Sequence, residues 1–338
     1  MKIALIGCGK QAAKHIAGLK RCRGVEIVLA DQEPGLARAL GEREGAHWVE
    51  SSEEVFTDPK VIAVDLCVPT PFHAPLIRRS LLAGKDFFCE KPLCETAAEA
   101  REINDLTLRA GRIGMVGYVY RYAPVFNEVR SILSGAGETG ESSVIGKINA
   151  ALMRIGGRGS AAVWKHRRDG GGGAINEMLV HMLDLAVWYF GPIEHAELLM
   201  KDLLRPERVI GGKLETADAE DIVIARFRSR AGVPIIIEAD LLTASFTQMI
   251  EVQGESGTLM ASIQPEMPQF VFTLRAAGGY AAGRTDLRFE NINLFDAQMA
   301  AFVAAVRERK FEARTILADS VHVMKALERL KAEAGNRG

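Results

Sequence analysis

Short apolar runs and amphipathic segments alternate along roughly the first third of the chain. The apolar runs predict strands, and the segments between them carry apolar residues at helical spacing. The predicted strands cover residues 2–6, 25–31, 61–69, 86–93 and 113–120, and the predicted helices cover 12–22, 38–46, 73–84 and 95–111, with a capped turn at 51–58. Such alternation predicts a doubly wound parallel sheet, an α/β fold that binds ligands at the carboxyl ends of its strands.

After a predicted helix at 121–135, the pattern changes to alternating apolar and polar positions. Strands are predicted at 147–155, 194–202, 219–229, 233–242, 248–256, 257–263 and 269–276, and helices at 170–191, 294–310 and 315–335. These features predict an α+β fold with a large open, mainly antiparallel or mixed sheet. An open sheet face commonly pairs with another subunit, so we expect a homodimer or homotetramer formed through this sheet.

The length of 338 residues suits two domains. We expect a dinucleotide-binding Rossmann domain at residues 1–121 and a substrate-binding and oligomerisation domain at 122–338, whose C-terminal helix can pack back on the first domain. The 42 basic and 43 acidic residues give a formal net charge of −1, which favours neither nucleic acid nor a membrane as a partner.

The absence of targeting patterns and the spacing of the cysteines indicate the cellular compartment. The apolar runs are too short to cross a bilayer, and the N-terminus lacks the pattern of a signal peptide. Five cysteines, an odd number, stand at positions 8, 22, 67, 89 and 94 with neither disulfide-framework nor zinc spacing. These features predict a cytoplasmic protein with reduced thiols and no metal site.

A glycine-rich loop joins the first predicted strand to the first predicted helix. Gly7 permits a tight turn, Gly9 lets the backbone approach a pyrophosphate, and Ala12 keeps the helix close to the sheet. Asp31 ends the next strand, where its carboxylate can accept hydrogen bonds from both ribose hydroxyls. Its charge repels a 2′-phosphate and Gln32 adds no cation, so we expect NAD rather than NADP.

A charged pair, Glu90-Lys91, directly follows the apolar run 86–89 and is followed by Pro92. Strand ends of a parallel sheet share one edge, which brings this pair beside the glycine-rich loop and puts Lys91 near a nicotinamide ring. The predicted cofactor-binding residues are Gly7, Cys8, Gly9, Lys10, Gln11, Asp31, Pro69, Thr70, His73, Glu90 and Lys91.

The predicted helix at 170–191 carries three polar residues on an apolar background. Glu177, His181 and Asp184 are spaced four and three residues apart, which places them on one face of an α-helix. Polar groups in line on an apolar helix are costly unless they face a cavity or pair with one another. We therefore expect this face to line a site, in which Asp184 either orients His181 or completes a polar network.

These motifs resemble the glucose–fructose oxidoreductase / inositol dehydrogenase / rhizopine-catabolism (Gfo/Idh/MocA) family over nearly the whole length. The resemblance rests on GCGKQA, VPTPFH, CEKPL, GYVYRYAP, GGGGAINEMLVHMLD and LFDAQMAAFVAAV. It implies that Lys91 is the catalytic lysine and His181 the catalytic histidine. Glu177 stands where many members have aspartate and Leu179 where glycine is frequent, so these two residues affect the choice of substrate.

The resemblance also implies the residues that contact the substrate and the reaction. Arg121 falls where family members often contact substrate; the full set of expected substrate-binding residues is Tyr118, Arg121, Trp164, Lys165, Asn176, Glu177 and His181. We expect an NAD-dependent oxidoreductase that transfers hydride between nicotinamide and a secondary alcohol of a cyclic polyol, sugar or sugar acid. Lys91 and His181 would supply the base and the oxyanion donor, and the sequence leaves open which residue is the base.

Two other functions and one feature of the substrate stay open. The alternatives are an NAD-dependent glycoside hydrolase that works by transient oxidation and elimination, and a dinucleotide and sugar sensor without catalysis. The stretch 154–168 is rich in cations and is either a solvated loop or a sign of a carboxylate or phosphate on the substrate.

Overall fold

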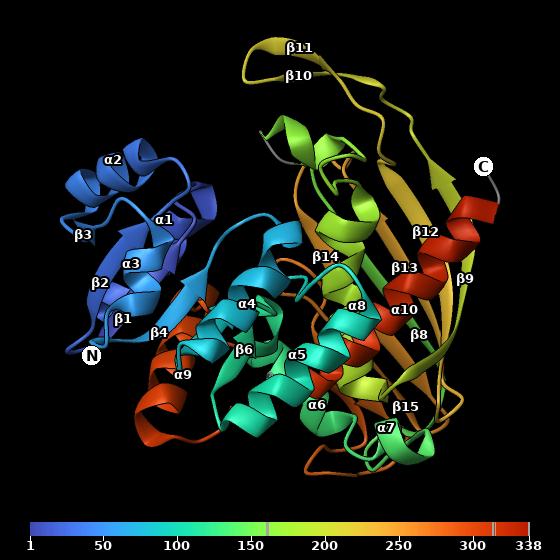
Figure 1. Ribbon diagram of the computed structural model, residues 1–338. Helices are drawn as coiled ribbons and strands as arrows, with labels where there is room; N and C mark the ends of the chain where they lie inside the picture. The colour runs from blue at the N-terminus through green and yellow to red at the C-terminus, as the bar shows by residue number, and fades with distance from the viewer. Residues whose placement is uncertain (160–161, 313, 315, 337–338) are drawn as a thin grey trace. The chain divides into compact units, whose positions relative to one another are not determined.

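The structure, a computed structural model, describes residues 1–159, 162–312, 314 and 316–336. The chain forms two compact units, each of which has most of its contacts within itself. Figure 1 labels their helices and strands. Unit 1 contains Met1–Tyr122 and Ile292–Met324, and unit 2 contains Ala123–Asn291 and the chain from Lys325 onward. Each unit is built around its own large sheet.

The sheet of unit 1 has six strands in the order β3-β2-β1-β4-β5-β6. Every neighbouring pair in it is parallel. The strands are β1 (Lys2–Ile6), β2 (Glu26–Ala30), β3 (His47–Trp48), β4 (Val61–Leu66), β5 (Asp86–Cys89) and β6 (Gly114–Val116). This order confirms the predicted doubly wound sheet, whose direction of growth reverses beside β1 and β4.

The helices that contribute to unit 1 are α1 (Lys10–Arg21), α2 (Pro34–Glu44), α3 (Ser52–Thr57), α4 (His73–Leu82), α5 (Ala97–Ala110), α9 (Leu294–Glu308) and α10 (Leu317–Asn336), with 3₁₀ turns η1 (Thr70–Phe72) and η2 (Val119–Tyr122). Helices α1 to α5 lie between these strands along the chain, whereas α9 and the first part of α10 join unit 1 from the C-terminal end of the sequence. The segment 51–58 is a short helix rather than a turn, because Ser51 and Glu54 form a capping box. The strand expected at 113–120 ends at Val116, since the chain then enters η2.

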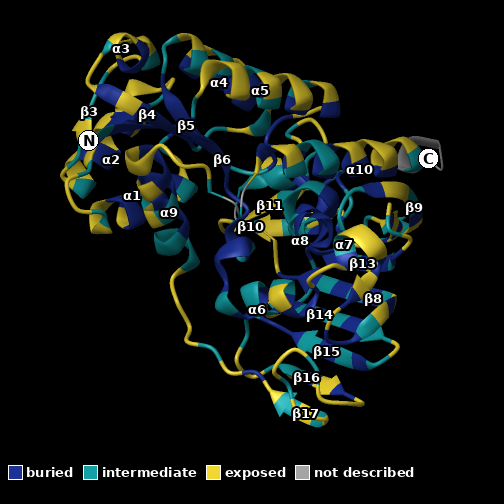
Figure 2. Ribbon diagram, turned by 90° about the horizontal axis from the view of Figure 1, so that it is seen from below, coloured by how far each residue is buried: buried dark blue, intermediate teal, exposed yellow. Residues whose placement is uncertain are grey.

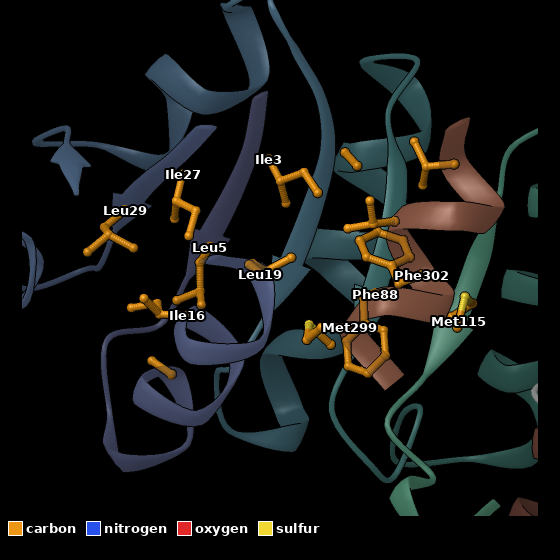
Figure 3. Packing of buried hydrophobic residues seen from close by; sticks show 14 of the residues in the cluster. Ile3, Leu5, Ile16, Leu19, Ile27, Leu29, Phe88, Met115, Met299 and Phe302 are labelled. Atoms are coloured by element: carbon orange, nitrogen blue, oxygen red, sulfur yellow. The ribbon is translucent and has the colours of Figure 1, made fainter. Parts of the chain in front are cut away.

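The core of unit 1 joins α1, the sheet and α9. Ile16 and Leu19 of α1, Leu5 of β1, and Met299 and Phe302 of α9 are all fully buried in one cluster (Figure 3). A Cβ at Gly18 would lie 2.9 Å from Met299, so glycine there lets α1 approach α9 closely. Replacing one of the large side chains by alanine would cost about 2–5 kcal/mol.

Unit 2 contains a nine-stranded sheet, in which eight strands follow the order β17-β16-β15-β14-β8-β13-β12-β9 and the ninth, β7, pairs with β8. Its strands are β7 (Glu141–Ser142), β8 (Gly146–Gly156), β9 (Ile193–Asp202), β12 (Ile222–Ser229), β13 (Pro234–Asp240), β14 (Thr247–Gly254), β15 (Gly257–Ala261), β16 (Phe270–Thr273) and β17 (Gly283–Asp286). Only β8 and β13 are parallel neighbours among the described strands of this sheet, which confirms the mainly antiparallel prediction.

Helices cover one face of this sheet. They include α6 (Pro124–Ile132), α7 (Ala136–Thr139) and α8 (Val180–Phe190), of which α8 contacts β8 and β13 and α6 contacts β15. Along β8, β13 and β14, buried residues alternate with partly exposed ones (Figure 2). A separate hairpin, β10 (Glu207–Ile210) with β11 (Lys213–Thr216), was not expected from the sequence. Within the described residues, none of the helices has the length and apolar character needed to span a membrane.

Candidate active site

The glycine-rich loop has the geometry that a pyrophosphate requires. Gly7 has a φ of +98°, and a Cβ there would lie 2.7 Å from the Cys67 carbonyl carbon, so only glycine fits. A Cβ at Gly9 would meet no heavy atom within 4 Å, which leaves this side of the loop open to a ligand. No side chain caps the start of α1, so the N–H groups of its first turn can bind phosphate.

Asp31 is held beside this loop by two backbone groups. The Cys8 N–H donates to Oδ2 at 2.7 Å, and the Glu33 N–H donates to Oδ1 at 2.9 Å. A carboxylate oxygen has further lone pairs, so Asp31 can still accept the ribose hydroxyls. Burial, and secondarily the Asp31 charge, raises the pKa of the Cys8 thiol to about 12, which keeps this thiol protonated. The loop, the helix start and Asp31 together fit the dinucleotide NAD.

Glu90 connects the predicted catalytic loop to the nucleotide-binding helix. Its Oε1 accepts a hydrogen bond from Gln11 Nε2 at 2.9 Å and lies 2.9 Å from His15 Nε2. Its Oε2 accepts from the backbone N–H of Lys91 at 3.2 Å. The structure therefore brings Gln11, Glu90 and Lys91 together at the carboxyl edge of the sheet. His15 is a functional candidate that the sequence analysis missed, although it lies one helical turn after Gln11.

Burial alone would raise the pKa of Glu90. Hydrogen bonds and charge from His15, then Gln11 and Lys91, outweigh burial and lower the pKa of this carboxyl to about 2. Glu90 is therefore an anion at neutral pH, next to Lys91, whose catalytic role stays a prediction.

His73 joins two loops at the same edge of the sheet. The side chain is buried, with Nδ1 at 2.8 Å from the Pro92 carbonyl oxygen and Nε2 at 2.9 Å from the Val68 carbonyl oxygen. Burial lowers its pKa. His73 thus ties the loop after β4 to the loop after β5, whereas a direct contact with the cofactor stays a prediction. Pro69 directly precedes η1, Thr70 is the first residue of η1, and Lys10 is exposed at the start of α1.

The structure places Arg121 and Tyr118 inside unit 1. Arg121 is fully buried, and its Nη1 donates to Asp319 Oδ2 at 2.7 Å and to the Arg314 carbonyl at 2.7 Å. Its guanidinium also lies 5.4 Å from the centre of the Tyr118 ring, and Tyr118 is 2% exposed. These contacts join η2 to Arg314 before α10 and to Asp319 in the first turn of α10, and a contact of either residue with substrate stays a prediction.

In unit 2, the glycine run lets two backbone segments touch. A Cβ at Gly170 would lie 2.5 Å from the Trp164 carbonyl oxygen, and one at Gly172 would lie 2.3 Å from the Lys165 carbonyl oxygen. The turn Val163–His166 therefore packs directly against the residues that enter the long helix. Side chains larger than hydrogen would push this turn away.

This packing brings several predicted site residues together. Lys165 Nζ lies 2.5 Å from Glu177 Oε2 and 5.1 Å from the centre of the Trp164 ring. Asn176 Nδ2 donates to the Gly171 carbonyl at 2.9 Å. Glu177 is thus a paired carboxylate within unit 2, a partnership that the sequence alone did not indicate.

The helix expected at 170–191 is divided in the structure. Ile175–Leu179 forms a π-helical turn, and Val180–Phe190 forms α8. The α-helical spacing used to predict one polar face therefore applies to His181 and Asp184, which lie in α8, but not across the turn to Glu177. His181 is partly exposed, and Asp184 is 1% exposed. Turns of this kind often occur at functional sites.

Acidic side chains accompany the cation-rich stretch. Arg154 Nε lies 3.0 Å from Glu238, and Arg167 Nε lies 3.7 Å from Asp218. With the Lys165–Glu177 pair, these contacts offset charge that an anionic substrate would otherwise use. A carboxylate or phosphate on the substrate stays a prediction.

Comparisons with known proteins agree with this geometry. Residues 1–118 match the model of an oxidoreductase family with an NAD-binding Rossmann fold, and residues 136–260 match the GFO/IDH/MocA C-terminal domain. The chain is similar to myo-inositol 2-dehydrogenase of Thermotoga maritima, with 28% identity over 266 residues, 77% of this chain and 75% of the relative. It is also similar to 1,5-anhydro-D-fructose reductase of Ensifer adhaerens, with 27% identity over 89% of this chain and 87% of the relative.

Solved structures share the fold. Levoglucosan dehydrogenase in complex with NADH and L-sorbose superposes with a TM-score of 0.84 at 20% identity, over 100% of this chain and 97% of that one. The family matches cover more than half of the chain, across both predicted halves. Together with the glycine-rich loop and Asp31, they show an enzyme that uses NAD. The chain therefore belongs to the GFO/IDH/MocA family of NAD-binding oxidoreductases.

Proposed function

We propose that this protein oxidises a secondary alcohol of a cyclic polyol or sugar with NAD, or catalyses the reverse reduction. The observation that carries the proposal is the fixed Glu90, whose bonds to Gln11 and to the Lys91 backbone attach the Lys91 loop to the nucleotide-binding helix. The named relatives act on inositol or anhydrofructose, which supports a cyclic, hydroxylated substrate. The acidic partners of Arg154, Lys165 and Arg167 favour a neutral substrate over a sugar acid.

The proposed chemistry needs a base and an oxyanion donor. NAD, when bound, accepts the hydride from the alcohol carbon. A ring nitrogen of His181 takes the hydroxyl proton as the C=O bond forms, and the Lys91 ammonium donates a hydrogen bond to the same oxygen as its negative charge develops. Lys91 in its neutral form is the alternative base. Glu177, held by Lys165, would accept a hydrogen bond from a neighbouring substrate hydroxyl.

The test measures reduced-nicotinamide absorbance when NAD and a panel of inositols, aldoses and sugar acids are added. We expect a rise with polyols or neutral sugars, and we expect Lys91→Ala to lose about a hundredfold or more of kcat while still binding NAD. The exposed Lys60→Ala is the matched control and should keep wild-type turnover. Lys91→Ala with near-normal turnover would remove Lys91 from the mechanism.

A flat response over the whole panel would contradict net oxidation. Release of bound NAD from the denatured protein, with turnover of glycosides, would then favour the hydrolase that restores its cofactor. Bound NAD and sugar without turnover of any substrate would favour the sensor.

We propose that the protein acts in the cytoplasm as a homodimer or homotetramer assembled through the sheet of unit 2. The cysteine spacing supports a reducing compartment. Apolar side chains on the strands support assembly, because Ile236 is 38% exposed and Phe272 is 40% exposed. Light scattering of the purified protein should give two or four chains, and a monomer at micromolar concentration would contradict this arrangement.

A further inference from the structure

Three ionisable groups meet in the interior of unit 1. His15 and Asp65 are each 0% exposed, and the side chain of Glu90 is 13% exposed. They come from three elements: His15 from α1, Asp65 from β4 and Glu90 from the residue after β5. Charged groups in such a place destabilise a fold unless each is paired.

Asp65 stands in the middle of the parallel sheet. Its register partners are Leu5 on β1 and Phe88 on β5, so the neighbouring strands offer apolar side chains. Its two carboxylate oxygens lie 3.0 and 2.9 Å from His15 Nδ1, and the Cys67 thiol lies 3.7 Å from Oδ1. His15 is therefore the cationic partner that the described structure gives this buried carboxylate.

His15 has acidic partners on both ring nitrogens. Besides the contact of Nδ1 with Asp65, Nε2 lies 2.9 Å from Glu90 Oε1, and the Phe88 ring packs edge-on at 5.4 Å. Only the imidazolium can donate from both nitrogens at once. Burial by itself would lower the pKa of His15, but the charge of Asp65 and its hydrogen bond to the ring raise it well above the ordinary 6.5.

The groups facing the ring are thus Asp65 and Cys67 on one side and Glu90 on the other. Burial raises the pKa of the Cys67 thiol, so this group is neutral. The cluster then holds two carboxylates and one imidazolium, with Lys91 as the next cation along the chain.

We propose that His15 is a positioning residue, an imidazolium that links Asp65 to Glu90 and so holds the Lys91 loop in register with the nucleotide-binding helix. Gln11 and His15 lie one turn apart on α1 and contact the same oxygen of Glu90. The other oxygen of Glu90 accepts from the Lys91 backbone. This inference rests on the proposed function, because it assigns catalysis to Lys91.

Its primary test is a double-mutant cycle of His15→Gln and Asp65→Asn. His15→Gln leaves two buried carboxylates without their shared cation, so Glu90 shifts or takes up a proton. We expect kcat to fall by about tenfold to a hundredfold, because a displacement of about 1 Å in a catalytic group has this effect. The Kd for NAD, measured by protein fluorescence, should stay within about threefold.

Asp65→Asn in the His15→Gln background removes the excess negative charge. We expect the double variant to recover part of the lost kcat, so that the two single losses are not additive. His47→Gln, at an exposed histidine of unit 1, is the matched control and should behave as wild type. Additive losses, or a His15→Gln variant within about twofold of wild-type kcat, would overturn the proposal while leaving the proposed function intact.

Two readouts do not require turnover, and they separate a failure of this proposal from a failure of the proposed function. Nitrogen-15 NMR of the seven histidines should show His15 protonated on both nitrogens at pH 7. Hydrogen exchange at the Lys91 amide should be faster in His15→Gln than in wild type. A neutral His15 or an unchanged exchange rate would overturn the proposal even in an enzyme without a known substrate.

A metal ion is the competing explanation for this cluster. Ligand atoms of His15, Asp65 and Cys67 lie within 4.8 Å of one another, which a metal could bridge. Elemental analysis of the purified wild-type protein decides between the two. A stoichiometric metal that is lost in His15→Gln would overturn the proposal that His15 is an imidazolium, since Nδ1 would then be a metal ligand. A metal-free protein would support that proposal.

Discussion

Glu90 makes the unfolding free energy of unit 1 depend on acid pH. Burial would raise the pKa of this carboxyl, yet its contacts with His15, Gln11 and Lys91 lower it from 4.5 to about 2. The stabilisation is therefore complete above about pH 4.5 and is lost as the pH falls from there toward about 2. At about 1.4 kcal/mol per pH unit, the shift is worth up to about 3 kcal/mol near neutral pH. The contact between His15 and Glu90 contributes to the pKa shift of Glu90, so the raised pKa of His15 is not added to the unfolding free energy as a separate contribution.

Urea unfolding measures this contribution, with Trp48 as a fluorescent reporter in unit 1. Trp164 and Trp188 are replaced by phenylalanine in every protein compared. We expect Glu90→Gln to lower the unfolding free energy by about 3 kcal/mol at pH 7, and by only about 2 kcal/mol at about pH 3.5. The exposed Glu95→Gln is the control, and its difference from wild type should not change with pH.

The outcome can refute the reasoning in two ways. A Glu90→Gln difference that is equal at both pH values would contradict a lowered pKa. A variant as stable as the wild type at pH 7 would show that the contacts of Glu90 with His15 and Gln11 do not stabilise unit 1.

Three further predictions follow from the other contacts. Asp31→Ala should weaken NAD binding by about tenfold or more and reduce discrimination against NADP, and an unchanged cofactor preference in a fluorescence titration would contradict the ribose contact. Gly172→Ala should lower the unfolding free energy of unit 2 by about 1–3 kcal/mol, because its Cβ would overlap the Lys165 carbonyl, and calorimetry showing no loss would refute this packing. Arg121→Ala should cost about 1–3 kcal/mol of stability, because it removes a buried side chain together with its hydrogen bonds to Asp319 and the Arg314 carbonyl, whereas a raised KM with unchanged stability would show a substrate contact instead.

The nucleotide-binding fold and its NAD cofactor could be predicted because the pattern that indicates them is local in sequence. Gly7 and Gly9 lie between the first strand and the first helix, and Asp31 follows the second strand. Each position follows from the strand and helix pattern around it. The same pattern placed Glu90 at the sheet edge where it contacts Gln11. Spacing along the chain was enough to place both residues at this edge, since parallel strands end at one edge, but their contact with each other was not predicted.

Other parts could not be predicted because their partners are distant or their backbone is irregular. Arg121 is paired with Asp319, 198 residues further along the chain, so its burial has no local signal. The π turn that carries Glu177 breaks the α-helical spacing on which the polar face was inferred. His15 has the helical spacing of a core position, and nothing in its neighbours indicates that two carboxylates meet there.

Reduction of added NAD by the wild type, Lys91→Ala and Lys60→Ala tests the central claim most directly. We expect the wild type and Lys60→Ala to reduce NAD with a cyclic polyol or neutral sugar, and Lys91→Ala to be slower by about a hundredfold or more with NAD still bound. Turnover by Lys91→Ala near the wild-type rate, or no NAD reduction by the wild type with any member of the panel, would contradict it.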